Sequence, residues 1–129
     1  MAYDMEIVQS LDSSMSYVKE SFRISGTAPL EEFDVCVWHA AAELEYALFL
    51  FSLKIQDENV TKGWKPNRSR RKDDVATLLK AAQESLSRSQ ESVCAEEWLK
   101  AYRDAFAARH LLLWVQKDLA KKRRGSFKK

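Results

Sequence analysis

Apolar residues recur at spacings of three and four along the first part of the chain, which is the repeat of an amphipathic helix. Between residues 3 and 24 they form one apolar side: Met5, Val8, Leu11, Met15, Val18 and Phe22. The segment SGTAPL (25–30) interrupts this pattern with Gly26 and Pro29, and Thr27 is available there as a helix cap. We therefore predict a first helix over about residues 3–24.

A second helix is predicted over about residues 30–56, and it is apolar on two sides. One side carries Phe33, Val37, Ala40, Ala41, Leu44, Leu48, Phe51 and Ile55. The other carries Val35, Trp38, Ala42, Tyr46, Phe49 and Leu53. We expect the second side to be covered either by the first helix or by a partner, with Trp38, Tyr46, Phe49 and Leu53 as the interface.

The segment DENVTKGWKPNRSRR (57–71) is long for a connection in a compact bundle. Asp73 is then a candidate N-cap for a third helix, whose apolar side is Val75, Leu78, Leu79, Ala82 and Leu86. The next break is predicted at Ser87, Ser89 and Ser92. A fourth helix follows over about 93–123, with Trp98, Tyr102, Ala105, Phe106, Leu112, Leu113 and Leu119 on its apolar side.

Composition agrees with long helices in one soluble domain. The 129 residues include only three glycines and two prolines, so there are few sites for tight turns. The pattern predicts an all-α fold, a four-helix antiparallel bundle over residues 1–120 with a long basic loop between helices 2 and 3, followed by a basic tail at 121–129. The N-terminus lacks a signal-peptide pattern, and no segment approaches about 18 uncharged apolar residues. We expect a cytoplasmic protein without a membrane span.

No metal or cofactor is expected. Cys36 and Cys94 fall inside apolar helical patterns without CxxC spacing, which favours small buried hydrophobic residues over a disulfide or zinc site. The two histidines have no clustered cysteines or acids beside them.

Basic residues are concentrated in two segments. Residues 62–72 (KGWKPNRSRRK) and 121–129 (KKRRGSFKK) carry six each, which leaves nine Lys and Arg against 19 acids elsewhere. Clustered cations attract phosphates, and Trp64 and Phe127 could stack on bases. The predicted nucleic-acid-binding residues are Lys62, Trp64, Lys65, Arg68, Arg70, Arg71, Lys72, Lys121, Lys122, Arg123 and Arg124. A solubilising loop and frayed tail, an anionic membrane or an acidic partner would fit the same charges.

Arg103 and His110 are the candidate catalytic residues. They lie seven positions apart on the fourth helix, so they project from one side, about 10 Å apart along the axis. We expect that side to be the margin of the apolar side, between Phe106 and Trp114. An imidazole that moves a proton and a guanidinium that stabilises phosphorane charge could cleave RNA without a metal. The alternative is a boundary histidine and an arginine that is solvated or paired with an acid. Arg109 points into the apolar side and should pair with Glu43 or Glu45.

At these residues the chain resembles the HEPN superfamily of small helical bundles, which is marked by an arginine, four to six intervening residues and a histidine. Arg103 and His110 match that pattern with six residues between them, and Asp104 is the polar residue that often follows the arginine. The segments VWHAAAELEYALFLFSLKI (37–55) and DDVATLLKAAQESL (73–86) resemble the family's early helices, so that the resemblance covers about 30–120. It implies a homodimer or heterodimer in which two Arg–His pairs meet, acting as a metal-independent endoribonuclease or binding nucleotide or RNA.

Two further functions stay open. In its size and its basic faces the chain also resembles the small all-helical subunits of CRISPR effector complexes. On this interpretation the chain is a non-catalytic part of a ribonucleoprotein. An antitoxin-like or adaptor bundle, binding protein through its two-sided helix, is the third.

Overall fold

The computed structural model describes residues 3–55 and 74–127, with side chains for residues 3–55 and 74–122. Within these ranges the chain forms four α-helices and no strand: α1 (Asp4–Ile24), α2 (Leu30–Lys54), α4 (Val75–Cys94) and α5 (Trp98–Phe127). The all-helical prediction is confirmed. The predicted connection at 57–71 and the predicted cap Asp73 lie outside the described residues.

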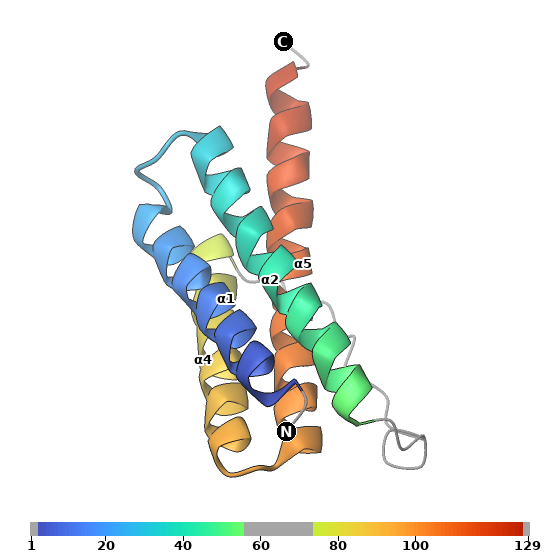
Figure 1. Ribbon diagram of the computed structural model, residues 1–129. Coiled ribbons are helices and arrows are strands. Elements are labelled where there is room, and N and C mark those ends of the chain that lie inside the picture. The colour runs from blue at the N-terminus through green and yellow to red at the C-terminus, as the bar shows by residue number, and fades with distance from the viewer. Residues whose placement is uncertain (1–2, 56–73, 128–129) are drawn as a thin grey trace.

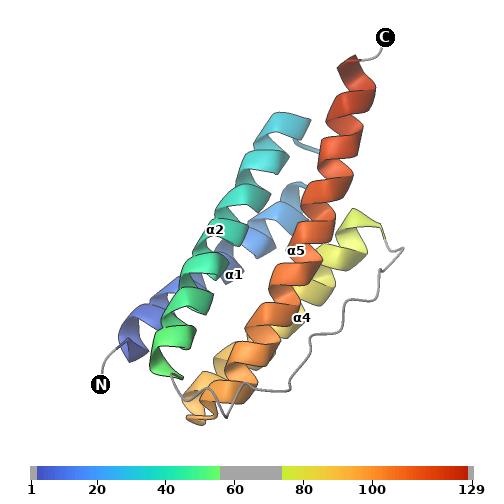
Figure 2. The ribbon, with the colours of Figure 1, turned by 90° about the vertical axis from the view of Figure 1, so that its right-hand side faces the viewer.

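Each helix packs against two of the others. α1 contacts α2 and α4, and α5 contacts the same two helices, so the four helices close into a bundle (Figure 1; Figure 2). The largest fully buried side chains come from all four helices: Ile7, Leu11, Leu44, Phe51, Leu79, Leu86, Leu112 and Leu119. Burial of this apolar surface in one shared core is the main force that holds the helices together.

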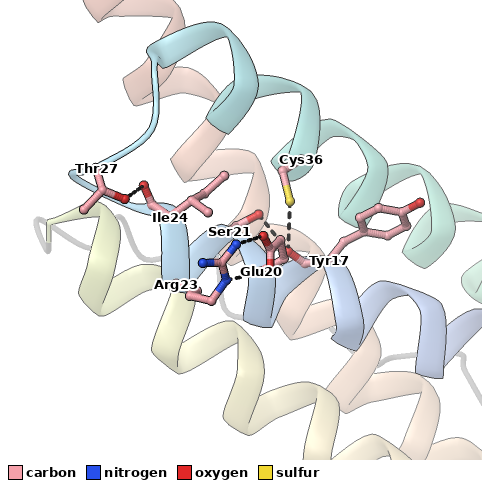
Figure 3. Close-up of polar contacts among 7 residues, drawn as sticks. All are labelled: Tyr17, Glu20, Ser21, Arg23, Ile24, Thr27 and Cys36. Carbon is pink, nitrogen blue, oxygen red and sulfur yellow. Dashed lines mark hydrogen bonds and ion pairs between the residues drawn. The ribbon is translucent and has the colours of Figure 1, made fainter.

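The turn between α1 and α2 is built on Gly26, whose φ of +83° is in the left-handed region that glycine adopts without strain. The Thr27 side chain bonds to the last turn of α1 and does not cap α2, because its Oγ1 donates a hydrogen bond of 3.1 Å to the carbonyl of Ile24 (Figure 3). α2 begins after Pro29 without a side-chain cap. α1 and α2 are thus joined by a turn with glycine in a left-handed conformation and by a helix start that follows proline.

Figure 3 also shows how polar groups are satisfied along the last turns of α1. The Ser21 hydroxyl donates to the carbonyl of Tyr17 at 2.8 Å, and the Cys36 thiol of α2 donates to the same carbonyl at 3.4 Å. Arg23 donates to the Glu20 carboxylate at 2.9 Å, a contact that lowers the pKa of Glu20. These contacts tie α1 to α2 and stiffen the end of α1.

The buried side of α1 differs from the predicted apolar side. Leu11, Met15 and Val18 are buried as predicted. Three predicted core residues are instead exposed: Met5, Val8 and Phe22. Their places facing the interior are taken by Ile7, Ser10, Ser14 and Ser21. Serine is small and can bond to a backbone carbonyl, so it fits a close helix contact that a polarity pattern assigns to solvent.

The predicted break at Ser87, Ser89 and Ser92 is wrong, because α4 continues through these residues to Cys94. Ser89 and Ser92 are buried, and the Ser89 hydroxyl donates to the carbonyl of Ala101 at 2.7 Å. The turn occupies residues 95–97 instead, where Glu96 adopts a φ of +59°. α5 therefore begins at Trp98 and not near residue 93.

The N-terminus of α4 is capped by Asp74, directly after the predicted cap. Its carboxylate accepts a hydrogen bond of 2.8 Å from the backbone N–H of Thr77. This hydrogen bond lowers the pKa of Asp74. Capping satisfies one of the N–H groups that a helix start leaves without an intrahelical partner.

α5 is the longest described helix and continues to Phe127, four residues past its predicted end, so that the basic residues 121–124 extend it. Its buried side is made largely of small and aliphatic residues: Ala101, Ala105, Ala108, Leu111, Leu112, Val115 and Leu119. Leu113 was predicted in the core but is exposed. The aromatic residues Trp98, Tyr102 and Phe106 are half-buried at the edge of the core.

α2 has one buried side and one exposed apolar side. Val35, Trp38, Tyr46 and Phe49 each expose more than half of their surface, and Leu53 is half-buried. The prediction that the first helix could cover this side is therefore wrong. By length and composition alone, α2 could span a membrane, although core helices of soluble proteins pass the same test.

The two cysteines are not both small core residues. Cys94 is exposed at the end of α4, and Cys36 is half-buried. Both are free thiols.

Candidate functional site

Arg103 and His110 lie on the side of α5 that faces away from the core residue Leu112. With 3.6 residues per turn, Arg103 is half a turn round the helix from Leu112, and His110 lies close to the same line as Arg103. Both side chains are half-buried, and the Nε of Arg103 and the Nε2 of His110 are buried from solvent. The two residues therefore share one side of α5, as predicted, but that side is opposite the core and not at the margin of the core face.

A series of aromatic rings connects His110 to the core. The His110 and Phe106 ring centroids are 5.1 Å apart, and Phe106 is 6.0 Å from Tyr102. Tyr102 in turn contacts the fully buried ring of Phe51 on α2, at 6.2 Å. Tilted contacts of this kind are favourable arrangements of aromatic rings. The imidazole of His110 therefore packs against Phe106 at the outer end of this series.

Asp104, the polar residue that follows Arg103, is directed towards α4. Its carboxylate lies 3.6 Å from the guanidinium of Arg88, which also donates to the hydroxyl of Ser85 at 3.0 Å. Arg88 is exposed, whereas Asp104 is only 21% exposed. Asp104 thus joins α4 to α5 beside the Arg103 position.

Arg109 pairs with Glu45 of α2, one of the two predicted carboxylates. Its guanidinium also lies 5.6 Å from the centre of the Phe106 ring. Both members of the pair are partly exposed, at 36% for Arg109 and 54% for Glu45, so the Arg109 side chain is not buried in the apolar side of the helix, into which it was predicted to point. The pair fixes α5 against α2 at the level of Phe106 and His110.

The predicted basic residues are only partly within the described structure. Residues 62–72, which include Lys62, Trp64, Lys65, Arg68, Arg70, Arg71 and Lys72, lie outside it. Lys121 and Lys122 are exposed on α5, and Lys122 pairs with Asp118 at 3.4 Å. Arg123 and Arg124 continue the helix, and their side chains are not described.

His39 lies on α2 and not on α5, and its ring stacks on Tyr17 of α1 at 5.0 Å. Trp38 contacts the edge of the same imidazole at 5.3 Å. Among the described residues, no three His, Cys, Asp or Glu side chains are grouped so that they could hold a metal ion.

A cavity of about 470 Å³ lies at another part of the bundle. It is lined by the turn between α1 and α2, the start of α4, and Leu119 and Lys122 of α5. It contains neither Arg103 nor His110, so it is not the predicted site.

Two more residues share the Arg103–His110 side of α5: Trp114, which the helical repeat places beside the pair, and Lys117, which sequence reasoning missed. They follow His110 by four and seven residues, which is the spacing of one helix side. Trp114 is half-buried, and the Lys117 ammonium lies 4.5 Å from the centre of its indole. Extending the helical repeat beyond Trp114 would have found Lys117.

No protein-family model, curated protein or solved structure matches this chain.

Proposed function

We propose that this protein is an RNA-directed helical bundle similar to the HEPN superfamily, in which Arg103 and His110 act together as a metal-independent endoribonuclease. The observation that carries the proposal is their shared side of α5, about 10 Å apart along the axis, with the His110 ring held against Phe106. A long guanidinium and an imidazole at this spacing can reach towards one phosphodiester from either side.

The chemistry divides between the two side chains. The ribose 2′-oxygen bonds to phosphorus as the bond from phosphorus to the 5′-oxygen breaks. Neutral His110 accepts the 2′-hydroxyl proton while water protonates the leaving oxygen, or protonated His110 donates to the leaving oxygen while water takes the 2′-hydroxyl proton. Arg103 stabilises the negative charge that builds up on the phosphorane oxygens. The family resemblance adds a dimer in which two such pairs meet.

The finer architecture belongs to the same proposal. We infer an antiparallel four-helix bundle over residues 1–120, in which the basic segment 62–72 connects α2 to α4 and contacts nucleic acid together with the basic residues after 120. The short connections at 25–29 and 95–97 support it, because they join α1 to α2 and α4 to α5 as packed neighbours. We assign the protein to the cytoplasm.

The test uses the second histidine as a matched control. Purified wild type, His110→Ala and His39→Ala are incubated with a labelled mixed-sequence RNA in EDTA, and cleavage and gel shift are recorded together. We expect wild type and His39→Ala to cleave, and His110→Ala to bind without cleaving. Binding without cleavage by all three proteins would reject the catalytic role of His110.

The exposed side of α2 favours a second candidate, a non-catalytic helical subunit of a ribonucleoprotein, such as a CRISPR effector. Trp38, Tyr46 and Phe49 expose 58%, 51% and 57% of their surface, and aromatic residues of this kind are enriched in protein interfaces. This candidate predicts no turnover, loss of RNA binding when residues 62–72 are neutralised, and no effect of His110→Ala.

Self-association addresses the interface directly. If Trp38, Tyr46, Phe49 and Leu53 join two copies, sedimentation should show a concentration-dependent dimer that Tyr46→Glu converts to monomer. A wild type that stays monomeric at high micromolar concentration would show that this side of α2 does not join two copies and is available to a different protein.

A further inference from the structure

The outward side of α5 carries a line of cationic and aromatic residues that extends well beyond the Arg103–His110 pair. We define the α5 strip as Arg103, His110, Trp114, Lys117 and Lys121. Their spacings of seven, four, three and four residues keep all five within about 60° of one another around the helix. Lys117 and Lys121 are exposed, and the other three are half-buried.

The acids of α5 pair with cations that are not part of the strip. The described part of α5 has two, Asp104 and Asp118. Asp104 contacts Arg88 on α4, and Asp118 pairs with Lys122 within α5 at 3.4 Å. The strip is therefore a positively charged surface. Outside the two basic segments, by contrast, the chain has more acidic than basic residues.

We propose that the α5 strip is a binding site for single-stranded RNA, with phosphates on Lys117 and Lys121 and a base or ribose against Trp114. This inference rests on the proposed RNA-directed function and adds the surface that holds the strand. From Arg103 to Lys121 the strip is about 27 Å long, which suits a short single-strand site of about four nucleotides.

The mixture of residue types favours a single strand over a duplex or an acidic protein. A duplex offers phosphates but keeps the faces of its bases stacked, whereas an unpaired base can lie against an indole. The Lys117 ammonium over the Trp114 ring, 4.5 Å from its centre, places a cation where it can bind the phosphate next to that base. An acidic peptide would use the cations and leave the indole unused.

Position on the helix links this surface to the chemistry. Lys117 and Lys121 lie about two and three turns beyond His110 towards the C-terminus of α5. A strand that follows the strip from Lys121 to Trp114 continues along the same side of α5 to His110 and Arg103. The strip therefore sets the direction from which RNA enters the proposed site.

The test measures affinity by fluorescence anisotropy with a labelled 12-nucleotide single-stranded RNA, the DNA of the same sequence, and the duplex of that RNA. The variant is Lys117→Gln/Lys121→Gln. The matched control is Lys19→Gln/Lys80→Gln, which removes two exposed lysines from α1 and α4, beside a separate surface depression. Circular dichroism verifies that each variant is folded.

Loss of two phosphate contacts should reduce the slope of log K against log salt by about 1.4 and weaken binding about 25-fold at 0.1 M salt. The control should keep the wild-type slope. In a second variant, Trp114→Leu, we expect an affinity loss of about tenfold with an unchanged slope, because a stacking contact carries no charge. Wild-type protein that binds the DNA more tightly than the RNA would reject RNA as the ligand of the strip.

Each of the other possible results rejects a specific part of the proposal. Wild-type binding that is unaffected by Lys117→Gln/Lys121→Gln rejects the strip and keeps the proposed function. Equal losses in variant and control show a general charge effect and also reject the strip. Duplex binding as tight as single-strand binding rejects the ligand class. Absence of RNA binding by the wild type rejects both the strip and the proposed function.

Discussion

The hydroxyl of Ser14 in α1 donates a buried hydrogen bond of 2.8 Å to the carbonyl of Ala40 in α2. The other packed pair of helices repeats this contact, since Ser89 of α4 donates to the carbonyl of Ala101 in α5 at 2.7 Å. In both cases a fully buried serine faces an alanine. The small side chains let the two backbones approach, and the hydrogen bond satisfies the hydroxyl in the core.

Ser14 should therefore be sensitive both to loss of its hydroxyl and to added volume. We expect Ser14→Ala to lower the free energy of unfolding by about 1 kcal/mol. Ser14→Leu should cost more, about 1–3 kcal/mol, because a longer side chain forces α1 away from α2. Urea unfolding measures both, with the exposed Ser16→Ala as control. A Ser14→Leu protein as stable as the wild type would contradict close packing at this point.

Phe51 and Phe49 form a matched pair on α2, because they are the same residue type two positions apart on opposite sides. Phe51 is fully buried, whereas Phe49 is 57% exposed. Phe51→Ala should lower the free energy of unfolding by about 3–5 kcal/mol. Phe49→Ala should change it by about 0.5 kcal/mol or less in dilute solution. Thermal or urea unfolding of the two variants side by side decides the point; similar losses would mean that Phe49 is buried in solution.

The Glu45–Arg109 pair should contribute little to stability although it joins α2 to α5. Both side chains are partly exposed, so solvent screens the interaction. A double-mutant cycle with Glu45→Gln and Arg109→Gln should give a coupling energy below about 1 kcal/mol, which decreases further in 1 M salt. A larger coupling that is insensitive to salt would show that the pair is shielded from water.

Asp74 makes the start of α4 dependent on pH. Its pKa is lowered by the hydrogen bond from Thr77, so the ionised form stabilises the folded protein. This contribution is complete above the ordinary aspartate pKa of about 3.9 and is lost as the pH falls through the lowered pKa of the folded state. At neutral pH, Asp74→Ala should destabilise the protein more than Asp74→Asn, since asparagine can still cap. The difference between wild type and Asp74→Asn should shrink in acid; unfolding midpoints at pH 7 and pH 3 measure this, and a constant difference would exclude the charge effect.

The repeat of apolar residues was sufficient to predict an all-helical fold and the position of α2, because long aliphatic runs with little glycine or proline leave few alternatives. The repeat was insufficient wherever a serine side chain packs in the core. Ser14 was not recognised as a core residue of α1, and Ser89 was taken as a break in α4, because a hydroxyl in sequence looks the same whether it faces water or a backbone carbonyl. Only the facing helix, which supplies the carbonyl, distinguishes the two.

The candidate site shows the same limit in another form. The helical spacing of Arg103 and His110 predicted that they share one side of α5, and the structure agrees. From the sequence, Glu43 and Glu45 were equally good partners for Arg109, and only the rotation of α2 against α5 selects Glu45. The repeat placed Trp114 beside the pair and could have added Lys117, whereas the contact between Asp104 and Arg88 depends on the packing of α4.

The pairing of α1 with α2 and of α4 with α5 has a consequence for how the chain folds. Each pair is joined by a connection of only a few residues, and its serine–alanine contact links positions 26 and 12 residues apart in the sequence. Contacts between near neighbours are found with little loss of chain entropy, so we expect folding within milliseconds. Each pair would form as a unit, and the core would close when the two halves dock.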